Sequence, residues 1–410
     1  MHQSELIPGL FRSEFSKICA VLTSYMGLGH LQTAEDIASE TFVAALETWT
    51  YNGIPENPVA WLYVVSKNKA RNYLHRTNLF AEKIAGDLMQ SDSITEEPDI
   101  DWSDQNISDS QLRMLFAICH PAIPVEAQIG LALRILCGFG IDEIASAFLT
   151  NKETINKRLF RAREKLREAK VNISYLSGAT IQDRLETVLT TLYLLYNEGY
   201  YSESNESLLR QELCLEAMRL TYLLIGNERT NLPCVNALFA LMCFHSSRFP
   251  ARKSTDEKFV LYADQDETLW NHDLIAKGAY YLHLASQGNT ISKYHLEASI
   301  AYWHTIKEDT IEKWETILQL YNQLLQIEYS PIAALNRTYA LSKANGNEEA
   351  ILEAEKLQLK DNQYYFTLLG VLYKDIDRDK SKICFEKAHS LARTQIEKKT
   401  ILNHLDKSEY

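Results

Sequence analysis

The chain has 410 residues, of which 46% are hydrophobic, a formal net charge of −12, and few Pro and Gly. This length exceeds one ordinary core and predicts two or three domains. The acidic balance argues against a protein that coats nucleic acid, although a local basic site remains compatible with it. Scattered cysteines, no signal-peptide pattern and no apolar run near ~20 residues predict a cytoplasmic protein with reduced thiols and no membrane span.

Apolar residues recur at helical spacing and strand-like alternation is hard to find, so the chain is predicted to be almost entirely α-helical. A first helix is expected over about 8–25. A second, over about 34–50, has its apolar residues on one face and an acidic stripe, Asp36, Glu40 and Glu47, on the opposite face. Such a stripe is most often a solvated surface. The alternative is a docking surface for a basic partner helix.

The next helix is predicted to begin at Asn57 and Pro58, which suit the N-cap and the first helical position. It mixes aromatic residues such as Trp61 and Tyr63 with several cations. Aromatic faces can stack on unpaired bases while cations hold phosphates, a combination typical of single-strand binding. Aromatics at helical spacing are more often core, however, and Trp61 shares a face with Val65, so part of this set is expected to be structural.

From Ile84 to Asp109 the chain has eight acidic residues and neither Lys nor Arg. Low hydrophobicity and like charge predict a flexible linker that ends the first domain. Ser108 and Gln111 are then placed as the capping box of a helix that reaches Cys119.

Pro124 opens a further helix that stops at Gly138 and Gly140. Residues 141–167, IDEIASAFLTNKETINKRLFRAREKLR, have the outline of a helix-turn-helix. The second helix of the pair, numbered from Lys152, carries an apolar stripe of Ile155, Leu159, Ala162 and Leu166. Seven basic residues against two acidic ones leave +5 over 152–167 in an acidic chain. One explanation of this local positive charge is a solvated charged helix. The more specific explanation is a binding surface for an anionic partner.

Beyond Tyr175 tyrosines become frequent, on successive helical segments. Two stretches near the C-terminus resemble one another, and Gly346 and Asp377 occupy equivalent turns 31 residues apart. That spacing is close to the 34 of a tetratricopeptide repeat. The C-terminal half is therefore predicted to be an α-solenoid whose stacked helices share a core.

Together these pieces resemble the sigma-70 family of the extracytoplasmic-function class. The stretches 34–49 and 57–76 look like conserved region 2, and the helix-turn-helix ending in RLFRAREKLR looks like region 4. Residues 112–123, 192–203 and 261–271 are similar to the subgroup with a long tetratricopeptide-like extension. The resemblance implies an all-α chain of two small helical sigma domains, 1–80 and 108–172, joined by an acidic linker, 81–107, and followed by a helical extension, 173–410.

The resemblance also implies partners: core RNA polymerase and promoter DNA. The acidic face of Asp36, Glu40 and Glu47 would dock on the clamp helices of the polymerase. The loop that starts at Tyr51 and the following helix would open the −10 element and hold an extruded base. The residues expected there are Tyr51, Asn52, Trp61, Asn68, Arg71, Asn72 and Arg76.

The basic helix would enter the major groove of the −35 element. Asn156 and Lys157 are the candidates for base edges, because Asn pairs well with adenine and Lys with guanine. Phosphates would be held by Lys152, Arg158, Arg161 and Arg163. The turn, Leu149 to Asn151, has no Gly where many family members do, so the exact register of the helix start stays open.

In this subgroup the extension takes a regulatory part, so a regulatory protein or ligand is an expected partner at 173–410. The residues selected for a regulatory pocket are Asn197, Glu198, Tyr200, Asp264, Gln265, Asp266 and Trp270. The alternative, that these side chains fix helix junctions, is the more common situation.

A second functional class is a helix-turn-helix transcriptional regulator that binds a protein through the solenoid and never acts as sigma. That interpretation leaves the acidic face, the aromatic helix and the linker without a joint purpose. An enzyme is not expected, because the chain has no Gly-rich phosphate loop, no HExxH and no nucleophile motif. No cofactor and no metal site is predicted either.

Overall fold

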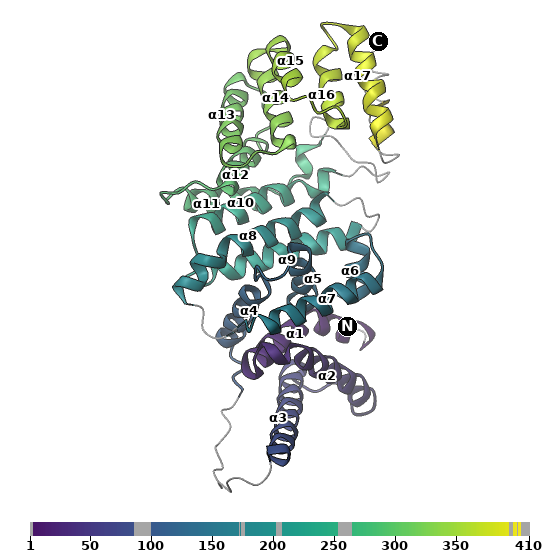
Figure 1. Ribbon diagram of the computed structural model, residues 1–410, viewed down its shortest axis with the longest axis vertical. Coiled ribbons are helices and arrows are strands. Elements are labelled where there is room, and N and C mark those ends of the chain that lie inside the picture. Colours follow the sequence, from purple (N-terminus) through teal and green to yellow (C-terminus); the bar gives the residue numbers. More distant parts are fainter. Residues whose placement is uncertain are drawn as a thin grey trace. The chain divides into compact units, whose positions relative to one another are not determined.

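A computed structural model describes residues 3–85, 100–171, 173, 177–201, 207–252, 265–392, 397–399 and 401–402. Every regular element over these residues is a helix, as Figure 1 shows, which confirms the all-α prediction. The chain divides into two compact units, Met1–Asn231 and Leu232–Tyr410. None of the described helices is long and apolar enough to cross a membrane.

The first unit begins with three helices that correspond to the predicted first domain. They are α1 (Gln3–Met26), α2 (Leu31–Asn52) and α3 (Pro58–Ala85). The prediction that Asn57 caps α3 is confirmed, since its side chain accepts a hydrogen bond from the Ala60 amide at 3.0 Å. The predicted acidic linker falls mostly on residues 86–99, which lie outside the described residues.

The helix α4 (Asp104–Ile118) starts earlier than predicted. Its N-cap is Ser103, whose hydroxyl accepts from the Asn106 amide, and Asp101 accepts from the Ser103 hydroxyl and amide. The capping box expected at Ser108 was therefore wrong. An S-x-x-N spacing supplied the cap instead, and Ser108 lies one turn inside the helix.

The helix-turn-helix prediction holds in the second half of this unit. The helices are α5 (Val125–Leu131), continued by a π-helical turn (Ala132–Leu136), then α6 (Ile141–Ala147) and α7 (Lys152–Glu168). All four residues of the predicted apolar stripe of α7 are buried. Asn151 caps α7 by accepting from the Thr154 amide at 2.8 Å, and Leu149 in the turn has a φ of 48°.

Two helices of the predicted extension, α8 (Gly178–Tyr201) and α9 (Ser207–Ile225), also belong to the first unit. Polar contacts join them to the helices before them. Thr191 donates to the Gln128 side chain at 2.7 Å, and the Arg219 guanidinium donates to the Leu136 carbonyl at 2.6 Å. The prediction began the extension at 173, whereas the compact units divide after Asn231. The predicted boundary at 173 is where the similarity to the two sigma domains ends. The packing boundary comes one helical hairpin later, because α8 and α9 pack on the first unit.

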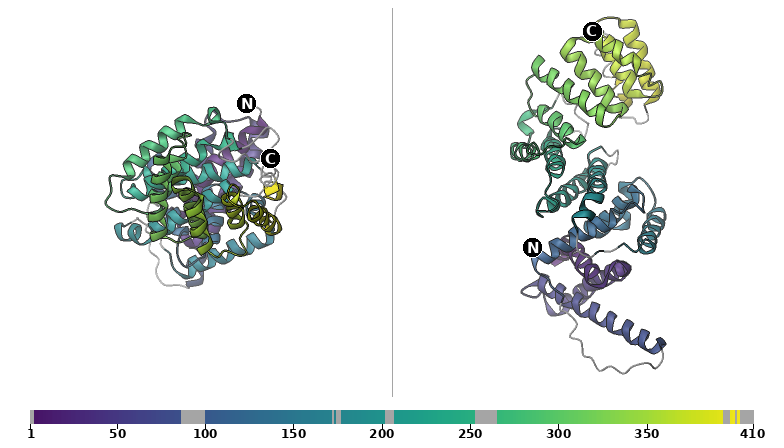
Figure 2. Two further views of the ribbon diagram at one scale, coloured as in Figure 1. Left: turned by 90° about the horizontal axis from the view of Figure 1, so that it is seen from above. Right: turned by 60° about the vertical axis from the view of Figure 1, so that its left-hand side comes forward.

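The second unit is a series of antiparallel helices. They are α10 (Pro233–Ser247), α11 (His272–Ala285), α12 (Lys293–Trp303), α13 (Ile311–Ile327), α14 (Pro331–Asn345), α15 (Asn347–Lys356), α16 (Gln363–Tyr373) and α17 (Arg378–Leu391). The pairs α14–α15 and α16–α17 are the two similar stretches of the sequence, and both form hairpins (Figures 1 and 2). This arrangement agrees with a C-terminal helical solenoid.

The equivalent positions Gly346 and Asp377 both lie in turns between paired helices, as the sequence predicted. Gly346 has a φ of 100° between α14 and α15, and Asp377 caps α17 by accepting from the Lys380 amide at 3.0 Å. Gly370 on α16 allows a close approach, because a Cβ there would lie 2.9 Å from the Phe385 ring of α17. The core of the solenoid depends on this small residue.

Candidate nucleic-acid and partner interface

The helix α7 presents a polar face to solvent. Lys152, Asn156, Lys157 and Arg161 are all exposed, while the apolar stripe on the other side of the helix holds the domain together. Lys152 also pairs with Asp142 of α6 at 2.5 Å, but both groups remain largely exposed. A pair of that kind contributes little and can open. This face has the shape and charge to enter a major groove.

Two of the predicted phosphate ligands on α7 are engaged inside the molecule. The Arg158 guanidinium lies 5.5 Å from the centroid of the Phe148 ring. Arg163 donates to the Glu35 carboxylate of α2 at 2.6 Å, and its side chain is 19% exposed. Arg163 can reach a DNA phosphate only if this ion pair opens.

Glu35 is the centre of a buried ion cluster between the two predicted sigma domains. Its side chain is 3% exposed and accepts from two arginines, Arg163 of α7 and Arg134 of the π-helical turn, the latter at 3.1 Å. Arg134 also donates to the Phe139 carbonyl and lies 5.6 Å above the Phe15 ring of α1. A buried carboxylate with two guanidinium partners is well compensated, whereas one left alone would be costly.

The aromatic residues of α3 are mostly packed against protein. Trp61 meets Trp49 edge to face with ring centroids 5.3 Å apart, and Tyr63 stacks on Trp102 at 4.5 Å. The Tyr63 hydroxyl donates to Glu14 at 2.6 Å, and burial together with this carboxylate raises the Tyr63 pKa. These contacts support the structural interpretation for Trp61 and Tyr63.

The remaining residues predicted for the −10 element come from the end of α2 and from α3. Tyr51 is 87% exposed and Arg71 is half-buried. The others are exposed, namely Asn52, Asn68, Asn72 and Arg76. An aromatic ring as exposed as that of Tyr51 has no packing role over the described residues, and it is available to stack on a base.

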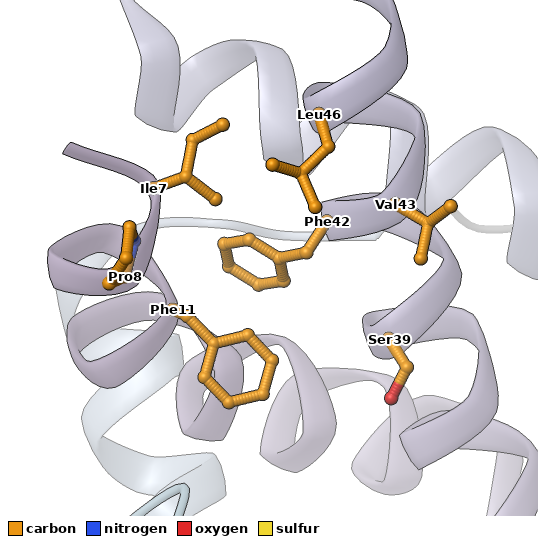
Figure 3. Close-up of a pocket in the computed structure, with 7 residues that line it drawn as sticks. All are labelled: Ile7, Pro8, Phe11, Ser39, Phe42, Val43 and Leu46. Atoms are coloured by element: carbon orange, nitrogen blue, oxygen red, sulfur yellow. The ribbon is translucent and has the colours of Figure 1, made fainter. Parts of the chain in front are cut away.

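The acidic stripe of α2 faces solvent, with Asp36, Glu40 and Glu47 all exposed. Glu40 pairs with Lys69 of α3 at 2.8 Å. Beside this stripe α1 and α2 form an open apolar groove of about 440 Å³ (Figure 3). The groove is lined by Ile7, Pro8, Phe11, Ser39, Phe42, Val43 and Leu46. Val43 and Leu46 are each 51% exposed, so α2 offers carboxylates and apolar side chains side by side.

The residues selected for a regulatory pocket are divided between the two units. Asn197, Glu198 and Tyr200 lie on α8 in the first unit, where burial raises the Glu198 pKa and Tyr200 stacks on Tyr196 with ring centroids 5.7 Å apart. Asp264 lies outside the described residues.

Gln265, Asp266 and Trp270 lie in the second unit. The Gln265 carbonyl accepts from Lys307, whose ammonium is 5.9 Å from the Trp270 ring centroid. Asp266 caps a short turn by accepting from the Thr268 amide and hydroxyl. These contacts agree with the interpretation that such residues fix helix junctions.

Sequence reasoning missed Glu35, Arg134 and the apolar groove. A signal for Glu35 was present, because it falls on the apolar stripe of α2 between Leu31 and Ala38. A carboxylate in a buried stripe must find a cationic partner. The partners could not be identified, because the pairs span 99 and 128 residues of sequence and depend on how the two domains pack.

Comparison with protein families gives two matches. Residues 10–79 match sigma-70 region 2, and residues 184–286 match a family of unknown function (DUF6596). The first match covers α1 to α3 almost completely. The second begins in α8 and continues into the second unit, so it includes the boundary between the two compact units.

Comparison with individual proteins gives three further similarities. An uncharacterised protein of Rhizobium meliloti is 32% identical over 385 residues, 92% of this chain and 90% of that one. The ECF RNA polymerase sigma-E factor of Haemophilus influenzae is 28% identical over 153 residues, 36% of this chain and 79% of that one. The ECF RNA polymerase sigma factor BldN of Streptomyces coelicolor is 27% identical over 141 residues, 34% of this chain and 51% of that one.

No solved structure matches. The Rhizobium meliloti similarity extends over nearly the whole of both chains, while the two sigma factors are similar over a third of this one. The chain therefore belongs to the same family as the Rhizobium meliloti protein, and its N-terminal part contains a sigma-70 region 2 and is similar to sigma factors of the extracytoplasmic-function type.

Proposed function

We propose that this chain binds core RNA polymerase and directs it to specific promoters, and that its C-terminal part regulates this activity. The observation that carries the proposal is the presence, within one compact unit, of an acidic and apolar docking face on α2 and an exposed basic reading face on α7. Neither face alone separates a sigma factor from other DNA-binding proteins.

The proposed docking face consists of the exposed acidic stripe of α2 and the apolar groove that α2 forms with α1. Carboxylates at Asp36, Glu40 and Glu47 attract a basic partner, and the half-exposed Val43 and Leu46 supply apolar area next to them. A central apolar patch with a charged rim is the usual composition of a specific protein interface. This face is the proposed contact with the clamp helices of the polymerase.

The promoter contacts are divided between two elements. The exposed Tyr51, followed along α3 by Asn68 and Asn72, supports a role in holding unstacked bases at −10. On α7, Asn156 and Lys157 are proposed to contact base edges at −35, with Lys152 and Arg161 on phosphates. Trp61 would contribute indirectly, because its packing on Trp49 holds α3 against α2 and so positions the exposed residues of α3.

The proposed regulatory part is the segment of the predicted extension, 173–410, that forms the second compact unit after Asn231. The hairpin α8–α9 is joined to the preceding helices through Thr191 and Arg219, so removing it would break these hydrogen bonds. A regulatory protein or ligand is proposed to act through the second unit.

The experiment is reconstitution of the full chain with core polymerase on genomic fragments, followed by mapping of transcript start sites. A set of starts that depends on this chain and shares −35 and −10 sequences is expected. A chain that binds duplex DNA equally well without polymerase, and produces no starts with it, would instead be a helix-turn-helix regulator that never acts as sigma.

A second reconstitution tests the regulatory part with a chain cut after Asn231. A change in the amount of promoter-specific transcript is expected. Equal transcription and equal polymerase affinity for the cut and full chains would remove the regulatory proposal while leaving the sigma activity intact.

A further inference from the structure

The joint that leads into the helix-turn-helix is held by a side chain from the predicted extension. The π-helical turn before this joint ends at Leu136, which is fully buried, and the last carbonyls of a helix have no partner within the helix. The Arg219 guanidinium of α9 donates to the Leu136 carbonyl at 2.6 Å, across 83 residues of sequence. We propose that Arg219 is a positioning residue for promoter reading. The inference rests on the proposed function, which supplies what is read.

Arg219 is well suited to hold the end of this helix. A buried carbonyl without a donor is costly, and a cation is favoured at the C-terminal end of a helix, where the partial charge is negative. Glu216, one turn earlier on α9, accepts from the Arg219 Nε at 2.8 Å, while Nη2 donates to the Leu136 carbonyl. The contact is therefore a charge-assisted hydrogen bond whose donor is itself held in place.

The joint, residues 137–140, is short. Gly138 has a φ of 71°, and the Phe139 amide donates back to the Leu133 carbonyl at 2.9 Å. At its end the Gly140 amide donates to Glu143 of α6 at 2.7 Å. Because so few residues separate the two helices, the direction of the Leu136 carbonyl constrains the direction of α6. Since α6 packs on α7, it also constrains the exposed face of α7.

A second contact comes from the same face of α9. Glu212 precedes Arg219 by seven residues, two helical turns, so the two side chains share a face. Arg12 of α1 pairs with Glu212 at 3.2 Å and with Glu143 at 2.6 Å. Thus α9 is connected to residues on both sides of the joint. These three side chains are 33–39% exposed, so their ion pairs contribute little, and Arg219 provides the principal contact.

Apolar packing has a different role from this hydrogen bond. The helix α8 contacts α4 and α5, and the hairpin contains buried residues such as Val188, Leu192 and Leu213. Apolar burial is non-directional, so it holds the hairpin on region 4 without fixing the direction of one carbonyl. A hydrogen bond is directional. Loss of the Arg219 donor should therefore leave the fold intact and loosen the joint.

The first test is hydrogen exchange of the full chain, which needs neither polymerase nor DNA. Arg219→Met keeps the aliphatic stem and has no N–H. Peptides covering 137–144 are expected to exchange about tenfold faster in this variant, because the joint opens more often. Unchanged exchange in these peptides would overturn the proposal.

The matched control is Arg184→Met. Arg184 is also an arginine of the α8–α9 hairpin that donates to a main-chain carbonyl, but its acceptor is Phe116 of α4, at 3.5 Å, rather than a residue at the joint. Exchange over 137–144 should therefore stay unchanged in this variant. An increase equal to that of Arg219→Met would show that any weakening of the hairpin loosens the joint, and would overturn the specific role of Arg219.

The second test is promoter discrimination. The measurement is the ratio of affinities of the polymerase complex for a mapped promoter with its native −35 element and with a scrambled one. Arg219→Met should lower this ratio about tenfold, as expected for one charge-assisted hydrogen bond. Arg219→Lys should restore most of the ratio, because an ammonium can donate to the same carbonyl. A merely structural role would lower both affinities together, so an unchanged ratio would overturn the proposal.

A further variant covers the case in which Arg219→Met does not fold, as judged by circular dichroism. Arg219→Gln keeps a polar side chain that is too short to reach the Leu136 carbonyl, and the same two changes are expected. Unchanged exchange or an unchanged ratio in folded Arg219→Gln would overturn the proposal.

The proposed function is scored separately, on the unsubstituted chain. Absence of promoter-dependent starts with that chain would reject the proposed function and this inference together. Promoter-dependent starts combined with an unchanged ratio in Arg219→Met would reject the inference alone.

Discussion

The helices α3 and α7 were both predicted to contact nucleic acid, yet the structure uses their side chains differently. Both mix cations with aromatic or apolar residues at helical spacing. On α3 the rings of Trp61 and Tyr63 are packed on protein, and the polar side chains between them are exposed. On α7 four apolar residues form a narrow buried stripe, Phe160 is exposed, and five of the seven cations face solvent.

The difference shows what composition can and cannot indicate. A helix with a narrow apolar stripe leaves most of its surface free for a partner. Aromatic rings distributed around a helix pack instead against any neighbouring helix, because each ring has a large apolar area to bury. Substitutions of the packed rings of α3 should therefore act on stability, and substitutions on the exposed face of α7 should act on DNA binding.

The largest effect is expected for Trp61→Ala. Loss of the ring that packs on Trp49 leaves a cavity in region 2 and should lower the free energy of unfolding by about 3 kcal/mol. Chemical denaturation of the full chain measures it. Val64→Ala on the exposed side of α3 is the control and should stay within about 0.5 kcal/mol. Equal effects of the two substitutions would show that Trp61 is not a core residue.

The next effect is expected on binding rather than stability. Asn156→Ala should weaken promoter binding of the polymerase complex by about 1–3 kcal/mol and relax the preference at one −35 position. Arg161→Ala should weaken binding about equally for all sequences and reduce the salt slope by about 1. Competition with mutated promoters measures both. A sequence-independent loss for Asn156→Ala would remove it from the base-contacting set.

A smaller effect is expected for Tyr63→Phe, which removes one hydrogen bond to the buried Glu14. The free energy of unfolding should fall by about 1 kcal/mol, because Glu14 keeps Lys17 as a partner. The Tyr63 pKa is raised above its ordinary value of 10.0 in the folded chain. The unfolded chain therefore releases this proton first, and stability is lost as the pH rises above about 10.

The Tyr63→Phe chain has no phenol to ionise and does not lose stability in this way as the pH rises. The stability difference between the two chains should consequently narrow above about pH 10. Denaturation at pH 8 and pH 11 measures it. A gap that widens with pH would contradict the assigned hydrogen bond.

The smallest effect is a gain. Leu149 in the turn before α7 is 69% exposed and has a φ of 48°, in the region that favours glycine. Leu149→Gly should raise the free energy of unfolding by about 0.5 kcal/mol, because relief of the backbone strain exceeds the entropy that Gly adds to the unfolded chain. Thermal unfolding measures it, and DNA binding should not change. Destabilisation would show that the Leu149 side chain has a packing role.

Much of the fold could be predicted from local pattern. The stripe of α7, the cap at Asn57 and the repeated turns at Gly346 and Asp377 depend on residues within a few positions of one another. The start of α4 could not be selected, because Ser103 and Ser108 are both acceptable N-caps.

Prediction of the candidate site was less complete, for a physical reason. The exposed faces of α2 and α7 followed from periodicity. The pairing of Glu35 with Arg163 depends on tertiary packing across 128 residues, and no local pattern encodes it. The division of the chain after Asn231 likewise reflects contacts of α8 and α9 with distant helices.

Promoter recognition by this chain together with polymerase is tested most directly by a hydroxyl-radical footprint of the full chain with core polymerase on a promoter identified by start-site mapping. Two protected patches attributable to this chain are expected, centred roughly 25 base pairs apart and lost together when polymerase is omitted. A single protected patch of duplex that persists without polymerase would contradict it.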